Sequence, residues 1–180
     1  MKEAARHRKS FQLSSLSRIK PVGLSAKRVI DIALAGFGIV LLSPLLLLCF
    51  AACRLSSPGP ALFGHQRIGF QGKYFRCLKF RTMAINAEEV LREYLALHPQ
   101  ANAEWEATRK LRVDPRVTAM GSMLRKTGLD EIPQLFNVLR GEMSIVGPRP
   151  VTEEELARYS TSAGSYLACR PGITGAFLTE

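Results

Sequence analysis

Asp130 and Glu131 are adjacent carboxylates that follow a pair of cations, Arg125 and Lys126. A proline stands just behind the acids, and proline is tolerated only in the first turn of an α-helix. The sequence therefore predicts a helix that begins near Asp130 and ends at Gly141. Acids at a helix start often only cap free N–H groups. Beside cations, the two acids also predict phosphate chemistry, in which one carboxylate binds a divalent cation and the other attacks phosphorus. The helix dipole and Arg125 would lower the pKa of the attacking carboxylate and keep it ionised.

Further cations could bind the anion on which such a carboxylate acts. Lys79 and Arg81 alternate along a predicted strand at 73–81, so they would point to the same side as two cations for one anion. A basic edge strand that resists aggregation or rests on lipid headgroups explains the pair equally well. Arg149 follows Pro148 and precedes another proline. Its stiff backbone suits an arginine that meets a phosphate, although a rigid surface turn would have the same sequence.

An apolar run predicts attachment to a membrane. The segment Ile32–Cys53 has 22 residues without a charge, and as a helix it would be about 33 Å long, enough to cross a bilayer. Pro44 predicts a kink near the middle, where the Ser43 hydroxyl can bond a freed carbonyl. Residues 1–28 hold eight basic side chains and one acid, and residues 54–83 hold six and none. Because positive flanks stay in the cytoplasm, a helix that re-enters the same leaflet is favoured slightly over a spanning helix with a tolerated proline.

Composition sets limits on the class of protein. The 180 residues are 47% hydrophobic and 22% charged, which excludes global disorder and a polytopic membrane protein. A formal net charge of +10 favours an anionic partner: nucleic acid, a phosphate-bearing ligand or an acidic membrane surface. The four cysteines form no CxxC pair, so a disulfide framework and a zinc site are not expected.

Local patterns predict the elements that must position these residues. Two strands at 61–68 and 73–81 would form a hairpin around 69–72. Surface helices are predicted at 87–97 and 101–112. The remaining predictions are a short helix at 119–126, a short strand from Ser144 that ends in the stiff loop, and a tight turn at 170–175.

Four segments together resemble the bacterial sugar transferases that start surface-polysaccharide synthesis, the monotopic polyprenyl-phosphate phosphoglycosyl transferases. They span about residues 27–175 in the family's order, and within the family they most resemble the small exopolysaccharide enzymes that load galactose-1-phosphate onto undecaprenyl phosphate. The segments are KRVIDIALAGFGIVLLSPLLLL, HQRIGFQGKYFRCLKFRTM, DPRVTAMGSMLRKTGLDEIPQLFNVLRGEMSIVGPRP and PGITG.

The resemblance implies a role for each candidate residue. Asp130 would attack the β-phosphorus of a UDP-sugar, expel UMP and hold the sugar phosphate until undecaprenyl phosphate takes it. Glu131 would bind Mg²⁺, and Arg125 would steady phosphate. The implied binding residues for the nucleotide and lipid phosphates are Lys79, Arg81, Pro148 and Arg149.

The resemblance also implies the architecture and location. The expected fold class is α/β of the α+β type: a basic tail at 1–26, a re-entrant membrane helix at 27–55 broken at Ser43–Pro44, and a small, mainly helical catalytic domain with a β-hairpin at 56–180. The implied location is the cytoplasmic face of a bacterial inner membrane. Expected partners are a UDP-sugar, undecaprenyl phosphate and anionic membrane lipid. Nucleic acid is not an expected partner, and a homo-oligomer is allowed.

The sequence departs from the family pattern in two places. Relatives usually continue past PGITG with Trp-Gln-(Val/Ile)-Ser-Gly-Arg, whereas here Ala176 to Glu180 read AFLTE, so the catalytic domain is expected to be truncated. Gly128 stands where many relatives carry serine, two residues before the implied nucleophile. Two alternatives therefore stay open: a truncated, inactive relative, and a basic membrane-anchored binding protein.

Overall fold

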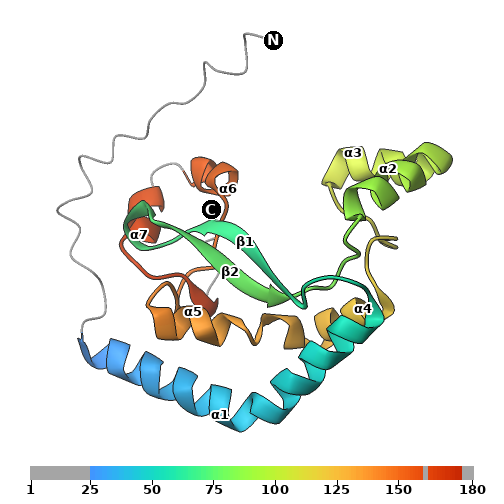
Figure 1. The fold of residues 1–180 in the computed structure, drawn as a ribbon. Helices are drawn as coiled ribbons and strands as arrows, with labels where there is room; N and C mark the ends of the chain where they lie inside the picture. Colours follow the sequence, from blue (N-terminus) through green and yellow to red (C-terminus); the bar gives the residue numbers. More distant parts are fainter. Residues whose placement is uncertain (1–24, 160–161, 176–180) are drawn as a thin grey trace.

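The computed structural model describes residues 25–159 and 162–175. The basic tail predicted at 1–26 and the chain after Gly175 lie almost wholly outside these described residues. The predicted mixture of helices with a few short strands is confirmed (Figure 1). The elements are α1 (Ser25–Ser56), β1 (Leu62–Ile68), the 3₁₀ turn η2 (Phe70–Gly72), β2 (Tyr74–Phe80), α2 (Ala87–Leu97), α3 (Pro99–Thr108), α4 (Ala119–Thr127), the 3₁₀ turn η3 (Leu129–Glu131), α5 (Gln134–Arg140), β3 (Ser144–Val146), α6 (Glu153–Arg158), α7 (Ala163–Leu167) and β4 (Gly172–Thr174).

Helix α1 bends where a proline interrupts its hydrogen bonds. The ribbon changes direction near the middle of the helix (Figure 1), and Pro44 lies inside it. Proline has no N–H, so the carbonyl of Val40 loses its usual partner one turn later. The Ser43 hydroxyl donates to that carbonyl at 2.8 Å. The predicted contact between Ser43 and a freed carbonyl is thus confirmed.

One side of α1 packs on the rest of the molecule and the other side stays exposed. The helix contacts α5, β3, α4 and β2. It is long and apolar enough to cross a membrane, judged by length and composition alone. An apolar surface of this extent marks an interaction site rather than ordinary solvent exposure. The exposed large apolar side chains of α1 are Val29, Ile30, Ile32, Leu34, Phe37, Val40, Leu41, Leu47, Leu48, Phe50 and Leu55.

The predicted hairpin is confirmed and lies above α1, α4 and α5 in Figure 1. Strands β1 and β2 are antiparallel, and the turn between them uses a positive φ of 56° at Gln71. Asn137 on α5 fixes the helix to β2, since its side-chain oxygen accepts from the Leu78 N–H at 2.9 Å and its amide donates to the Arg76 carbonyl at 2.8 Å. Asn137 is fully buried.

Two hydrophobic cores join α1 to the hairpin, and a third packs the end of β1 against α7. The first core consists of Ala35, Phe75, Cys77, Val138 and Met143. The second consists of Cys49, Cys53, Ala61, Phe80 and Leu124. The third consists of Ile68, Val151, Tyr166 and Leu167.

Helices α2 and α4 match their predicted positions to within a residue, but the second surface helix was placed wrongly. It was predicted at 101–112, whereas α3 runs Pro99–Thr108. Proline suits the first turn because it needs no N–H partner there. The helix ends early because Arg109 adopts a left-handed conformation with φ 54°.

The predicted tight turn at 170–175 contains a strand. Strand β4 runs parallel to β3, with Ser144 opposite Gly172 and Val146 opposite Thr174. A three-residue strand is too short to show an alternating pattern, and its partner lies far away in the sequence. This small sheet holds the loop that carries Arg149.

Candidate active site

The two acids lie in a 3₁₀ turn and not at the start of a helix. Helix α4 ends at Thr127, and Gly128 takes a left-handed conformation with φ 71° that turns the chain. Leu129–Glu131 then form η3, and α5 begins only at Gln134 with Pro133 as its N-cap. The prediction of a helix that begins near Asp130 is therefore wrong, because the proline precedes the first helical residue. The predicted stop at Gly141 is confirmed.

Asp130 is buried, with 9% of its surface exposed. Burial raises the pKa of Asp130 above the ordinary aspartate value, Lys79 opposes this rise, and Glu131 adds to it. The sequence predicted a lowered pKa from a helix dipole and Arg125. Arg125 does act in that direction, but burial dominates and Asp130 lies outside α5. A poorly solvated carboxylate carries its charge at a cost, which bond formation to an electrophile would relieve.

Lys79 and Glu131 form an ion pair at the edge of the hairpin. The Lys79 ammonium lies 2.5 Å from Oε1 of Glu131, and both side chains are partly exposed. Lys79 reaches η3 because it shares a strand face with Phe75 and Cys77, which pack into the core against α5. A pair with this exposure adds little to stability. The pair matters for the site because the Lys79 ammonium interacts with both Glu131 and Asp130.

A cleft of about 300 Å³ opens beside this pair. Lys79 and Glu131 line it together with Arg149 and the residues of β4. Arginine and lysine outnumber acids in the lining, which suits a ligand that carries phosphates. The lining residues are Arg67, Cys77, Lys79, Glu131, Gln134, Gly147, Arg149, Pro150, Gly172, Ile173, Thr174 and Gly175.

Arg81 was grouped with Lys79 on the sequence, but the structure does not bring the two together. Its guanidinium donates to the carbonyls of Cys53 at 3.2 Å, Ser57 at 2.7 Å and Pro58 at 2.6 Å. These carbonyls stand at and just after the C-terminal end of α1, where helical partners are missing. Arg81 thus caps α1 in this structure and is not among the residues that line the cleft.

Two further predicted residues lie near the site without lining the cleft. Arg125 on α4 donates from Nε to the Thr82 hydroxyl at 2.9 Å, and its charge lowers the pKa of Asp130. Pro148 lines a separate, smaller cavity of about 130 Å³ together with Asp31 and Ser144. Thr82, which the sequence analysis did not single out, holds Arg125 in place.

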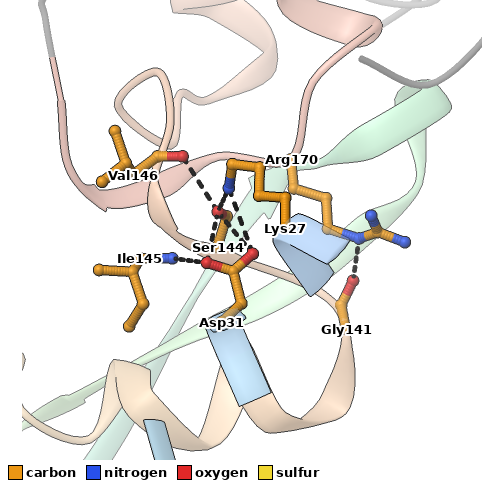
Figure 2. A network of polar contacts seen from close by, with 7 residues as sticks. All are labelled: Lys27, Asp31, Gly141, Ser144, Ile145, Val146 and Arg170. Atoms are coloured by element: carbon orange, nitrogen blue, oxygen red, sulfur yellow. Dashed lines mark hydrogen bonds and ion pairs between the residues drawn. The ribbon is translucent and has the colours of Figure 1, made fainter. Parts of the chain in front are cut away.

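Asp31 is a further polar residue that the sequence analysis missed. It lies near the start of α1 with 5% of its surface exposed, and Figure 2 shows its carboxylate facing Ser144, Ile145 and Lys27. The signal for it was an acid placed directly before a run of 22 residues without a charge. A carboxylate at such a position needs buried partners.

The site can be tested for its fit to Mg²⁺. Among residues 25–159 and 162–175, no three His, Cys, Asp or Glu side chains group together as a metal cluster. Mg²⁺ is commonly held by one or two carboxylates together with the phosphates of a substrate. Glu131, partly exposed on a cationic cleft, fits that mode of binding.

Comparisons with known proteins place the chain in a family. The profile of the bacterial sugar transferase family matches residues 22–179. The chain is 50% identical over 177 residues to the exopolysaccharide production protein ExoY of Rhizobium meliloti, covering 97% of this chain and 78% of the relative. It is 51% identical over 150 residues to the undecaprenyl-phosphate galactose phosphotransferase of Salmonella typhimurium, covering 83% of this chain and 31% of the relative. It is 42% identical over 152 residues to the UDP-glucose:undecaprenyl-phosphate glucose-1-phosphate transferase of Caulobacter vibrioides, covering 83% of this chain and 51% of the relative. The predicted transferase is thus confirmed as an enzyme class, and the chain belongs to the bacterial sugar transferase family.

Proposed function

We propose that this protein transfers a hexose-1-phosphate from a UDP-sugar to undecaprenyl phosphate, with release of UMP, as the first step of exopolysaccharide synthesis. The observation that carries the proposal is a buried carboxylate, Asp130, directly before Glu131, which lines a cleft that also holds three cationic side chains. Asp130 itself is not among the residues that line the cleft. Relatives named for galactose and for glucose transfer support the substrate class and leave the choice of hexose between these two sugars.

Asp130 is the proposed nucleophile. One carboxylate oxygen bonds to the β-phosphorus of the UDP-sugar, the bond from that phosphorus to the bridging oxygen breaks, and UMP leaves with the electron pair. A phosphate oxygen of undecaprenyl phosphate then attacks the same phosphorus and releases the carboxylate unchanged. Both substrates can therefore use the same cleft in turn.

The cations of the cleft bind and orient the phosphates. Lys79 and Arg149 both line the cleft, so both could contact the diphosphate of a bound nucleotide sugar. Lys79 also favours the ionised form of Asp130. Glu131 would hold Mg²⁺, which would neutralise phosphate charge when bound.

Membrane attachment through α1 is part of the proposal. The exposed apolar side of α1 would lie in the lipid, and the bend at Ser43–Pro44 would return the chain to the cytoplasmic leaflet of the inner membrane as a monotopic anchor. Basic residues at both ends suit anionic headgroups. A soluble nucleotide sugar and a lipid phosphate must meet at the headgroup plane, and a shallow anchor would place Asp130 there.

The direct test measures UMP release. The full chain in lipid is incubated with UDP-galactose or UDP-glucose, Mg²⁺ and undecaprenyl phosphate. UMP release is expected to disappear in Asp130→Asn and on chelation of the metal. The matched control is Glu153→Gln, which alters an exposed carboxylate that accepts from the Tyr74 hydroxyl at 2.8 Å, and it should keep wild-type activity. UMP release that survives Asp130→Asn would remove Asp130 from the mechanism.

A further inference from the structure

A carboxylate on α1 is bonded to the strand that leads into the arginine loop. Asp31 accepts from the Ser144 hydroxyl at 2.9 Å, from the Ile145 N–H at 3.0 Å and from the Lys27 ammonium at 3.2 Å. Lys27 also donates to the Ser144 hydroxyl, and Figure 2 shows the three side chains and the Ile145 amide converging. Charge-assisted hydrogen bonds to a buried carboxylate are the strong kind.

These bonds tie elements that are far apart in the sequence. Asp31 and Ser144 are separated by 113 positions, and the first belongs to α1 while the second opens β3. Strand β3 has only three residues, too few to fix its own position. The bonds from Ser144 and Ile145 therefore tie β3 to α1, in addition to its pairing with β4.

Strand β3 in turn sets one wall of the cleft. Gly147 follows β3 directly and lines both the small cavity beside Asp31 and the cleft that holds Lys79 and Glu131. The Gly147 N–H donates to the Thr174 carbonyl at 3.0 Å. A Cβ on Gly147 would lie 2.3 Å from the carbonyl oxygen of Arg170. The turn therefore has no room to shift against β4.

The backbone of Arg149 has little freedom of its own. Proline precedes and follows it, which restricts the backbone on both sides. The position of the Arg149 side chain in the cleft therefore depends on where β3 starts. That start is held by Asp31.

We infer that Asp31 is a positioning residue: its charged carboxylate holds β3 on the membrane helix and so places Arg149 against the phosphates in the cleft. The role rests on the proposed function of that cleft. Asp31 touches no substrate in this account and acts through β3. It couples the anchor helix to the site geometry, so that Arg149 is in place when α1 is packed on the domain.

The first arm of the test measures the position of β3 without any substrate. Asp31→Asn keeps the size of the side chain but replaces one acceptor with an N–H₂ group, which cannot accept from Ser144 or Lys27. Amide hydrogen exchange of the full chain in lipid should become faster at Ile145 and Gly147. Ser144→Ala should have the same effect to a smaller extent, and it serves as the second variant if Asp31→Asn does not fold.

The second arm is a double-mutant cycle with Arg149→Ala. Asp31→Asn alone should lower kcat/KM about 10- to 100-fold, the size expected from a small misplacement of a binding group. In the Arg149→Ala background it should add little, because the residue through which it acts is already gone.

Asp114→Asn is the matched control. The Asp114 carboxylate also accepts from a backbone N–H, that of Arg116 at 3.1 Å, and pairs with the Arg116 guanidinium at 2.7 Å, and these bonds lie outside β3. If Asp114→Asn lowers kcat/KM, the fold-loss in the double variant with Arg149→Ala should equal the product of the two single fold-losses, to within about twofold.

The two arms separate this inference from the proposed function. The positioning role would be overturned if amide exchange at Ile145 and Gly147 stayed unchanged in both Asp31→Asn and Ser144→Ala. It would also be overturned if the fold-losses in kcat/KM of Asp31→Asn and Arg149→Ala multiplied fully in the double variant. A wild-type protein that releases no UMP would overturn the proposed function instead, and the exchange arm would still decide whether Asp31 holds β3.

Discussion

The Lys79 ammonium, at the end of β2, lies 2.5 Å from Oε1 of Glu131. The same cation lowers the pKa of the neighbouring Asp130, while burial and the charge of Glu131 raise it. One lysine therefore holds the proposed metal ligand and opposes the protonation of the proposed nucleophile. This balance leads to a prediction about pH.

The acid limb of the pH profile should move in opposite directions in two variants. As the proposed nucleophile, Asp130 would have to be ionised to attack, so kcat/KM should fall as the pH drops through its pKa, which burial places above the ordinary aspartate value. Lys79→Met removes a cation and should shift the limb to higher pH. Glu131→Gln removes an anion and should shift it to lower pH, measured as residual UMP release against pH.

Lys73→Met is the control for the loss of a lysine charge, because Lys73 is exposed and lies outside the cleft. Lys73→Met should leave the midpoint of the acid limb unchanged. A shift of the same sign in Lys79→Met and Glu131→Gln would show that Asp130 does not set the acid limb.

Asp130→Asn should make the folded protein more stable at neutral pH while abolishing transfer. A carboxyl group whose pKa is higher in the folded state than in the unfolded state destabilises the fold once it is ionised. Asparagine avoids that cost, so its melting temperature should exceed that of wild type near pH 7. The difference should shrink as the pH falls toward about 3.9, the ordinary aspartate value. A lower melting temperature for Asp130→Asn near pH 7 would contradict the raised pKa.

Arg81 and Arg149 should respond differently to truncation. Arg81→Ala leaves three carbonyls around the end of α1 without their donor, and unfolding should become easier by about 1–3 kcal/mol. The KM for the UDP-sugar should stay near wild type. Arg149→Ala should raise that KM with little change in melting temperature. A raised KM in Arg81→Ala at unchanged stability would return Arg81 to the substrate-binding group.

The topology of α1 can be tested with single cysteines. Cysteines placed at Ala26 and Leu55, both exposed, in a background without the four native cysteines should react with a membrane-impermeant reagent from the cytoplasmic side only. Pro44→Ala restores the backbone N–H and should favour a straight, spanning helix in part of the population. Labelling of the two wild-type positions from opposite sides would defeat the re-entrant anchor.

Features that depend on short stretches of sequence were predictable. The apolar run, the hairpin and helix α4 have local patterns, and the bond from Ser43 to the Val40 carbonyl follows from the missing N–H of Pro44. The candidate acids and Lys79 were also found from residue type and spacing, and the structure places Lys79 beside Glu131.

Features that depend on packing between distant segments were not predictable. Strand β4 exists because it pairs with β3, and the raised pKa of Asp130 exists because that residue is buried. The alternation of β2 ends at Phe80, so strand geometry did not determine the direction of Arg81. The inferred role of Asp31 depends on its bond to Ser144, which lies 113 positions away in the sequence.

The central claim is that Asp130 becomes covalently bonded to the sugar phosphate. The protein in lipid is mixed with a UDP-sugar labelled in the β-phosphate, without undecaprenyl phosphate, then quenched, digested and mapped by mass spectrometry. We expect label on the peptide that contains Asp130, none in Asp130→Asn, and loss of label when undecaprenyl phosphate is added before the quench. Label on another residue, or none at all in a preparation that forms lipid-linked product, would contradict it.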